Sequence, residues 1–288
     1  NTCCDGSCKY LNRFGKYVCT SRAGNNPPAG FNSSPRPSFV TCFSGDMEVE
    51  TENKGTINMK ELAIGDRVLV DGDNKFDTVY SFGHRHESHE SEYLSITTTN
   101  EAAALELSRD HMVFSKPGHA VPAASLIKGD TVLLPSGELS TIVQINTVTR
   151  KGAYAPFTYS GALVVNGVVA SSFIGLQDTN EHWHFDTVKT PLTFQWVAHA
   201  FEAPHRLAYR LGLVGNSETY SADGVSRWVE LPYAIVQWLV GQNFWTMALL
   251  VLPTVALLTI VWVVEQNCLI TAAVLALVLL ARRSKKLC

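Results

Sequence analysis

The sequence has little charge. Charged residues make up 17% of its 288 residues, and the formal net charge is −3. A protein that binds nucleic acid needs a basic face, and this sequence does not provide one. The sequence also begins without a basic stretch followed by an apolar run, so no secretory signal peptide is visible after Asn1. We therefore expect no nucleic-acid partner, and we expect the chain to start inside a longer precursor.

Cysteine is scarce beyond the first twenty residues. Four of the seven cysteines lie within the first twenty residues, among Gly, Asn and Ser: Cys3, Cys4, Cys8 and Cys19. This density is typical of a disulfide-stapled extracellular module, and four cysteines allow three pairings that the sequence does not distinguish. A zinc site is the alternative, but no His lies among these cysteines and their spacing is irregular. Residues 1–23 are therefore predicted to be the end of a Cys-rich extracellular module.

The composition changes twice after this module. Residues 24–41 are rich in Gly, Pro, Asn and Ser and have no apolar period, which predicts an exposed linker. Residues 42–176 contain short runs of β-forming residues separated by turn signals such as DGDN, KPGH, PSGE and RKG. The runs are Arg67–Val70, Thr78–Phe82, Tyr93–Thr98, His111–Ser115, Thr131–Leu134, Thr141–Val148 and Ala162–Ser172. Strands at this spacing indicate an all-β domain, and residues 185–235 have a more helical or mixed pattern.

Long apolar runs are confined to the C-terminal end. Trp245–Val264 contains twenty residues without a charge, interrupted only by Pro253, and a shorter apolar run follows at Cys268–Ala281. Four cations come next: Arg282, Arg283, Lys285 and Lys286. The first run is long enough to cross a hydrocarbon core of ~30 Å at ~1.5 Å per residue. A buried core helix is the alternative, but the cationic end favours one or more transmembrane segments with a basic tail over residues 241–288.

Three blocks of the β-rich region form a pattern. Residues 42–46 read CFSGD and residues 59–69 read MKELAIGDRVL; residues 107–114 read LSRDHMVF; residues 151–173 start with KGAYAPFT and end with GALVVNGVVASSF. In this order and spacing, the blocks resemble the Hint (hedgehog/intein) domain of hedgehog proteins. That domain starts with Cys-Phe and contains L-x-x-L-x-I-G-D-x-V-L and T-P-A-H-L-V segments. The resemblance implies an autoprocessing domain of short antiparallel strands over residues 42–176, and an adduct-recognition-like or juxtamembrane region over residues 177–240.

Cys42, at the first position of this domain, is the predicted nucleophile. A peptide bond becomes a thioester when a thiol beside its own carbonyl attacks it, so Cys42 would attack the carbonyl of Thr41 in an N-to-S acyl shift. Thiols titrate near pH ~8.5, and the attack therefore benefits from a base, which we assign to His111. The resemblance gives Ser108 the role of the family Thr, which holds the scissile amide. Taken singly, Cys42 could be a disulfide cysteine, His111 a histidine of the core and Ser108 a turn residue. The prediction rests on the combination of the three.

The sequence departs from the hedgehog pattern at three positions. His84 stands where the family has the carboxylate that activates the sterol hydroxyl, and imidazole is also a base near neutral pH. The acceptor of the thioester therefore stays open between a sterol, another lipid and water. Ser172 replaces a family cysteine, and Thr41 is bulkier than the family Gly. His84, His86 and His89 also form an H-x-H-x-x-H cluster, but the glutamates around them favour a solvated polar hairpin, and we expect neither a metal nor a cofactor.

These observations predict a membrane-associated, hedgehog-like precursor that cleaves itself before Cys42 and transfers its N-terminal part to a hydroxyl acceptor or to water. Protein splicing is not expected, because no His-Asn pair ends the β-rich domain. One alternative is a catalytically inactive Hint domain that serves as a membrane-anchored interaction module. Another is a papain-like thiol protease, although that fold is helix-rich around its cysteine.

The same observations predict a location and partners. A disulfide module upstream places the Hint domain in the lumen of the secretory pathway or outside the cell, while the Arg282–Lys286 cluster prefers the cytosol. An odd number of crossings follows, so we expect one crossing plus an interfacial or re-entrant piece. A membrane lipid or sterol is the expected acceptor class, and the N-terminal module would bind extracellular partners.

Overall fold

The structure of the chain is a computed structural model. It describes residues 8–11, 16–19, 42–72, 74–100, 103–176, 180–185, 188–240, 242 and 244–284. Two compact units are present, residues 1–40 and residues 41–288. In the first, β1 (Cys8–Leu11) and β2 (Lys16–Cys19) pair antiparallel, with Cys8 opposite Cys19 in the backbone register. Cys3, Cys4 and the linker lie outside the described residues, and the disulfides stay a prediction.

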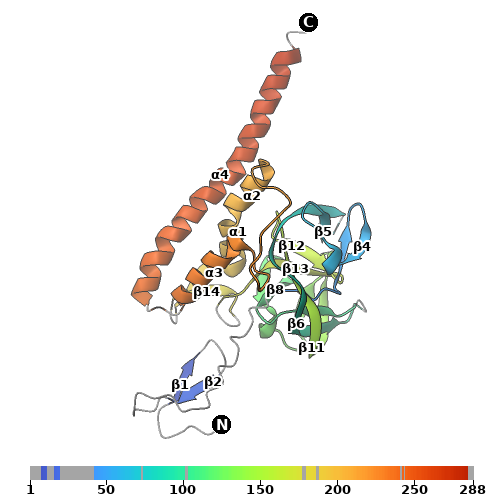
Figure 1. Ribbon diagram of the computed structural model, residues 1–288, viewed down its shortest axis with the longest axis vertical. Coiled ribbons are helices and arrows are strands. Elements are labelled where there is room, and N and C mark those ends of the chain that lie inside the picture. Colours follow the sequence, from blue (N-terminus) through green and yellow to red (C-terminus); the bar gives the residue numbers. More distant parts are fainter. Residues whose placement is uncertain are drawn as a thin grey trace. The chain divides into compact units, whose positions relative to one another are not determined.

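Antiparallel strands make up the first part of the second unit (Figure 1). The larger sheet has the spatial order β10 (Thr131–Leu133), β11 (Leu139–Thr158), β6 (Lys75–Thr98), β5 (Arg67–Asp71), β3 (Glu48–Thr51) and β4 (Gly55–Asn58). A short strand, β7 (Leu105–Leu107), also pairs with β6. The second sheet has the order β12 (Ala162–Val165), β13 (Val168–Ile174), β8 (His111–Lys116) and β9 (His119–Pro122). Single 3-10 turns lie at Met59–Glu61 and Ala123–Ser125. The all-β class predicted for residues 42–176 is confirmed.

Two long strands dominate the larger sheet. β6 and β11 pair from Thr98 opposite Ile142 to Val79 opposite Thr158. The predicted polar hairpin around His84–His89 and the predicted turn at RKG are therefore wrong, because these two segments pair with each other. Glu90 lies opposite Lys151 and His86 opposite Ala153, so β6 carries two extra residues in a bulge at this point. The polar side chains that suggested a hairpin belong to this irregular part of a continuous strand.

One predicted run is two strands. The run at Ala162–Ser172 folds back on itself as β12 and β13, with Val165 opposite Val168. The turn residues Asn166 and Gly167 have φ angles of 45° and 74°. An Asn-Gly pair with both φ values positive is the favoured two-residue hairpin turn, because its twist matches that of the strands. The Asn-Gly signal within the apolar run therefore marks a hairpin.

Helices follow the strands. After the hairpin of β14 (His182–Phe185) and β15 (Val188–Thr193) come α1 (Phe194–Phe201), α2 (Ala203–Arg210), α3 (Arg227–Val240) and α4 (Phe244–Ser284). The Thr193 hydroxyl accepts the backbone N–H of Trp196 and caps the start of α1. α1 packs on β13, and both α1 and α2 pack on α4. The mixed pattern predicted after the β-rich domain thus corresponds to a hairpin and a helical layer.

α4 is a single helix of 41 residues, about 60 Å long at ~1.5 Å per residue (Figure 1). Within it, Trp245–Asn267 is long and apolar enough to cross a membrane, and it is the one such helix among the described residues. The predicted interfacial or re-entrant piece is not a separate element, because residues 268–281 continue the same helix, and the number of crossings stays a prediction. The charged residue Glu265 lies within the helix and does not end it. Its carboxylate is tolerated there because it is buried against Arg206, with which it forms an ion pair.

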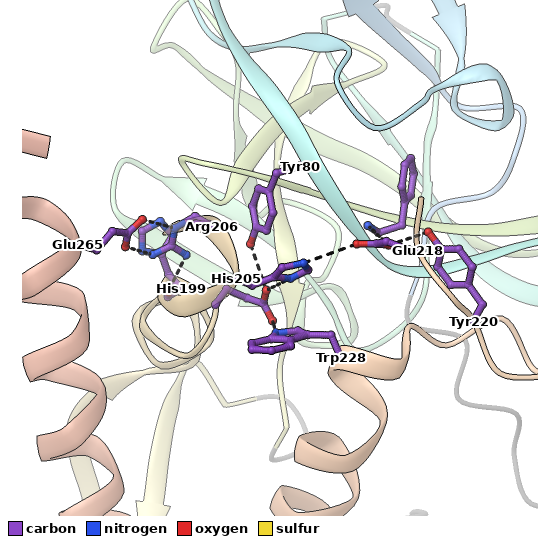
Figure 2. Close-up of polar contacts among 10 residues, drawn as sticks. Tyr80, His199, His205, Arg206, Glu218, Tyr220, Trp228 and Glu265 are labelled. Atoms are coloured by element: carbon purple, nitrogen blue, oxygen red, sulfur yellow. Dashed lines mark hydrogen bonds and ion pairs between the residues drawn. The ribbon is translucent and has the colours of Figure 1, made fainter. Parts of the chain in front are cut away.

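The Arg206–Glu265 pair joins α2 to α4, as Figure 2 shows. Arg206 Nη2 and Nε lie 2.7 and 3.1 Å from the two carboxylate oxygens, and both side chains are 1% exposed. Arg206 Nη1 also donates to the carbonyl of His199. The geometry is the bidentate one that suits an arginine–carboxylate contact. The pair therefore fixes the register of the two helices.

We expect Arg206→Ala to loosen α4 from α2 by about 3–5 kcal/mol, because the Glu265 charge would stay buried without its partner. Arg210→Ala is the matched control, since Arg210 is 24% exposed and lies 3.5 Å from the same carboxylate. Its loss should cost about 1 kcal/mol. Denaturant titration of both variants in detergent micelles, with hydrogen exchange of α4, measures the difference. Equal shifts for the two arginines would contradict this assignment.

Candidate active site

Cys42 and Phe43 are held between two strands. The Phe43 N–H donates to the carbonyl of Tyr154 on β11, and the Tyr154 N–H donates back, at 2.9 and 3.1 Å. The Ser108 N–H, just after β7, donates to the carbonyl of Cys42 at 2.9 Å. Both Cys42 and Phe43 are fully buried. The start of the Hint-like region is therefore fixed by backbone pairing, so the Cys42 side chain has a defined position.

Ser108 contacts the peptide nitrogen of Cys42. The Cys42 N–H donates to Ser108 Oγ at 3.0 Å, and Ser108 is 3% exposed. This nitrogen belongs to the peptide bond that joins Thr41 to Cys42. Thr41 lies outside the described residues. The residue expected to hold the scissile amide is in hydrogen-bond contact with that amide nitrogen.

His84, in the middle of β6, contacts the thiol. His84 Nδ1 lies 2.9 Å from Cys42 Sγ, and His84 Nε2 lies 2.6 Å from the carbonyl oxygen of Asp223. A carbonyl accepts and never donates, so Nε2 carries the ring proton and Nδ1 is left as the acceptor for the thiol. Burial lowers the pKa of His84, opposed in part by the hydrogen bond to the Asp223 backbone. The imidazole is therefore neutral at neutral pH and oriented as a base toward Cys42.

His111 lies on β8, behind the first residues of the domain. Its Nε2 is 2.8 Å from the carbonyl oxygen of Ser171, which places the ring proton on Nε2 by the same reasoning. Its ring packs on Phe43 with centroids 4.1 Å apart, and the residue is fully buried. The sequence predicts His111 as the base for the thiol, whereas the imidazole with a hydrogen bond to Cys42 Sγ is His84. The role of His111 as a base stays a prediction.

Two further polar side chains near Cys42, those of Tyr93 and Ser44, have hydrogen-bond partners. The Tyr93 hydroxyl donates to the carbonyl of Gly152, and burial, together with the nearby Cys42, raises its pKa well above the usual range. Tyr93 therefore stays protonated and is no base. The Ser44 hydroxyl donates to Glu106 at 2.9 Å, and Glu106 pairs with Arg150 at 2.8 Å. These bonds tie the residues after Cys42 to β7 and β11.

Three other residues singled out in the sequence, His86, His89 and Ser172, have contacts of their own. The ring centroids of His86 and His89 are 5.5 Å apart, and that of His89 is 6.2 Å from His84, because the β6 bulge turns it back. Ser172 lies on β13, where its hydroxyl accepts the N–H of Thr158 at 3.3 Å. Sequence reasoning did not find Asp223. Its contact runs through a backbone carbonyl 139 positions away, which no side-chain motif can signal.

Comparison with known proteins identifies the family of the chain. A family model described as the Hint module matches residues 31–241. Warthog protein 6 of Caenorhabditis elegans is 33% identical over 145 residues, 46% of this chain and 24% of that protein. Sonic hedgehog protein of Danio rerio is 26% identical over 226 residues, 70% of this chain and 50% of that protein. The chain thus spans half or less of the length of these two relatives.

Among solved structures, a bacterial intein-like domain from Clostridium thermocellum is similar at 19% identity. The match covers 46% of this chain and 98% of that domain, with a TM-score of 0.39. The Hint family model extends over most of the chain, from before Cys42 to the end of α3. The family predicted from the three sequence blocks is confirmed: the chain belongs to the Hint family.

Proposed function

We propose that this chain cleaves its own peptide bond between Thr41 and Cys42 through a thioester. One arrangement carries the proposal: Cys42 has its thiol 2.9 Å from a neutral imidazole and its own amide N–H on the Ser108 hydroxyl. A nucleophile paired with an oriented base is the arrangement that activates a thiol, and the contact to the amide nitrogen concerns the bond that would break. Membership of the Hint family supports autoprocessing as the class of reaction.

In the first step, His84 Nδ1 takes the thiol proton while Sγ attacks the carbonyl carbon of Thr41. The C–S bond forms and the C–N bond breaks, so the N-terminal part moves to sulfur as a thioester. The nitrogen of Cys42 receives the proton that His84 Nδ1 took from the thiol and becomes a free amine, which returns His84 to its neutral form. Ser108 holds the amide N–H in one direction while the nitrogen leaves. The sequence predicts His111 as the base for the thiol, whereas we assign this role to His84.

In the second step, a hydroxyl acceptor attacks the thioester carbonyl. The C–O bond forms, the C–S bond breaks, and the acceptor proton passes through His84 Nδ1 to the departing sulfur of Cys42. His84 suits both steps because its basic nitrogen faces the sulfur in each. A sterol, another lipid or water would serve as acceptor. The apolar helix Trp245–Asn267 supports a membrane lipid, since it would keep the site at a bilayer of the secretory pathway or cell surface.

The full chain, made by cell-free translation with liposomes, tests the proposal. We expect dithiothreitol or hydroxylamine to release a fragment that ends at Thr41, because each nucleophile intercepts a thioester. Without them, the intact mass of the fragment identifies the acceptor, since a free acid, a sterol ester and another adduct differ in mass. A chain that stays at full length under both nucleophiles would contradict the proposal and favour an inactive, membrane-anchored Hint module.

We expect Ser108→Ala to slow thiol-induced cleavage about tenfold. The buried Cys42 N–H would lose its acceptor, and an unpaired buried donor costs about 1–3 kcal/mol. Ser108→Thr is the matched control, because it keeps the hydroxyl and supplies the residue of the family motif. The measurement is the rate of dithiothreitol-dependent cleavage of pulse-labelled chain. Equal rates for the two variants would remove Ser108 from the site.

A further inference from the structure

The connection between α2 and α3 forms a small hairpin against the middle of β6. We define it as the 219–227 hairpin. Within it, the Ser221 N–H donates to the carbonyl of Val225 and the Gly224 N–H donates to the carbonyl of Ser221, at 2.8 and 3.0 Å. Tyr220 and Ser226 pair across it as an isolated bridge. The hairpin is therefore an ordered element, although it belongs to neither sheet.

The hairpin fills a gap in the edge of β6. One side of β6 pairs with β11 along most of its length, while the other side pairs with β5 near Thr78 and with β7 from Leu94. Between these partners, the Arg85 N–H donates to the carbonyl of Gly224 and the Ser226 N–H donates to the carbonyl of Gly83, at 2.9 and 3.0 Å. Unpaired strand edges readily take an added strand. A segment from beyond the strands thus completes the sheet beside His84.

We propose that the 219–227 hairpin is a positioning element of the self-cleavage site, with the Asp223 carbonyl holding His84 in the tautomer that accepts the Cys42 thiol proton. This inference rests on the proposed function. The 2.6 Å contact from His84 Nε2 to Asp223 keeps the ring proton on Nε2. If the proton moved to Nδ1, that nitrogen would become a donor and could not accept from the thiol. The hairpin therefore acts on the reaction through His84, without touching the reacting atoms.

Glycine at position 224 permits the close approach. Gly224 has a φ of +80°, and a Cβ there would lie 2.6 Å from His86 Cβ and 2.8 Å from the carbonyl oxygen of Arg85. Both distances are shorter than real Cβ contacts allow, and backbone cannot yield as a flexible side chain does. A larger residue would therefore push the hairpin away from β6 and withdraw the Asp223 carbonyl from His84.

A buried polar network anchors the hairpin, as Figure 2 shows. Glu218 accepts the Phe82 N–H of β6 at 3.1 Å and the Tyr220 hydroxyl at 2.7 Å. His205 Nε2 on α2 lies 3.9 Å from Glu218, and its Nδ1 lies 3.3 Å from Glu202. The contacts link the hairpin to β6 on one side and to the helical layer on the other. The arrangement supports a fixed hairpin, because each anchor is itself held by a second contact.

The helical layer continues the network through Glu202. Its carboxylate accepts the Tyr80 hydroxyl at 3.3 Å and the Trp228 indole N–H at 3.1 Å, so it joins β6 to α3 (Figure 2). Glu202 is 3% exposed. The residues just before and just after the hairpin are therefore held on the same buried cluster. The 219–227 hairpin is thus linked to the thiol indirectly: the Asp223 carbonyl contacts His84, and His84 contacts Cys42 Sγ.

Gly224→Ala tests the role of the hairpin in the full chain, with Gly215→Ala as matched control. Gly215 lies in the same connection, and a Cβ there meets nothing within 4 Å. We expect Gly224→Ala to slow dithiothreitol-dependent cleavage on the order of 10–100-fold near pH 7, part of the 10²–10⁴-fold worth of a general base. The defect should shrink toward pH 9, where a thiol ionises without help. Gly215→Ala should keep the parental rate.

The titratable groups that face His84 are Cys42, His86, His89 and Asp223. The Gly215→Ala control leaves all of them in place, so a pH profile that changes in Gly224→Ala alone reports the hairpin. A Gly224→Ala chain that cleaves at the parental rate at pH 7 would overturn the inference. A defect that stays constant up to pH 9 would overturn it too, since that pattern indicates general damage to the fold.

A second measurement does not depend on cleavage. In the full chain with Cys42→Ala, in detergent micelles, nitrogen chemical shifts of ¹⁵N-labelled histidine report which ring nitrogen of His84 carries the proton. We expect the proton on Nε2, and a mixture of tautomers when Gly224→Ala is added. A proton on Nδ1 in the first chain would overturn the inference. If the parental chain does not cleave, the proposed function fails, while this measurement still decides whether the hairpin sets the tautomer.

Discussion

Cys42→Ala is expected to abolish cleavage before residue 42, with or without dithiothreitol. The thiol is the atom that would receive the acyl group, and no other side chain of the described site combines a hydrogen-bonded base with direct attachment to the scissile nitrogen. Loss of a covalent nucleophile removes the pathway, so the expected effect is complete within detection. The measurement is the fraction of pulse-labelled chain released over time, followed by electrophoresis and intact mass.

Two controls separate chemistry from folding. Cys268→Ala replaces another cysteine of residues 41–288 and should leave cleavage at the parental rate. Cys42→Ser keeps a nucleophilic atom at the fully buried position, but a hydroxyl ionises far less readily than a thiol, so we expect slow or undetectable release. Far-UV circular dichroism of the Cys42 variants should match the parent. Release from the Cys42→Ala chain at the parental rate would assign the reaction to another residue.

The sequence alone predicts the parts of the site that local motifs encode. Cys42 and Ser108 come from blocks with a fixed order, and the structure brings them into contact. The same comparison places His84 at the family carboxylate position. It does not show that His84 would hydrogen-bond to the thiol, because the bulges between β6 and β11 decide which side chains meet. The all-β class is predicted from many turn signals together, so an error at a single turn does not change that prediction.

The misplaced elements have a common cause, which is a partner far away in sequence. The polar stretch around His86 is predicted as a solvated hairpin because glutamates surround its histidines, whereas β11, sixty or more positions later, pairs with it. Glu265 interrupts the apolar pattern and predicts a break, whereas its charge is matched by Arg206, 59 positions earlier. Local composition shows where a charged residue would be costly to bury, but the residue that pairs with it lies far away in sequence and is brought close only by the fold.

His84→Gln is expected to slow thioester formation about 10²–10⁴-fold at pH 7, the usual worth of a general base. Glutamine keeps an N–H group that can reach the Asp223 carbonyl, so the 219–227 hairpin stays docked, but its amide cannot accept a proton at neutral pH. The variant therefore removes the base and keeps the support. The measurement is the rate of dithiothreitol-dependent cleavage, with His86→Ala as control because it retains the Cβ that faces Gly224.

The cleavage rate of the parental chain and that of His84→Gln should depend on pH in different ways. Burial lowers the pKa of His84, so the neutral, basic form persists to lower pH than in an exposed histidine. In the parental chain, cleavage should rise as pH climbs through that lowered pKa and stay flat across neutrality. In His84→Gln the rate should instead keep rising up to the ionisation of the thiol near pH ~8.5, so the two curves converge in alkali. Parallel curves would mean that His84 holds the fold and takes no proton, which would leave the first step to His111.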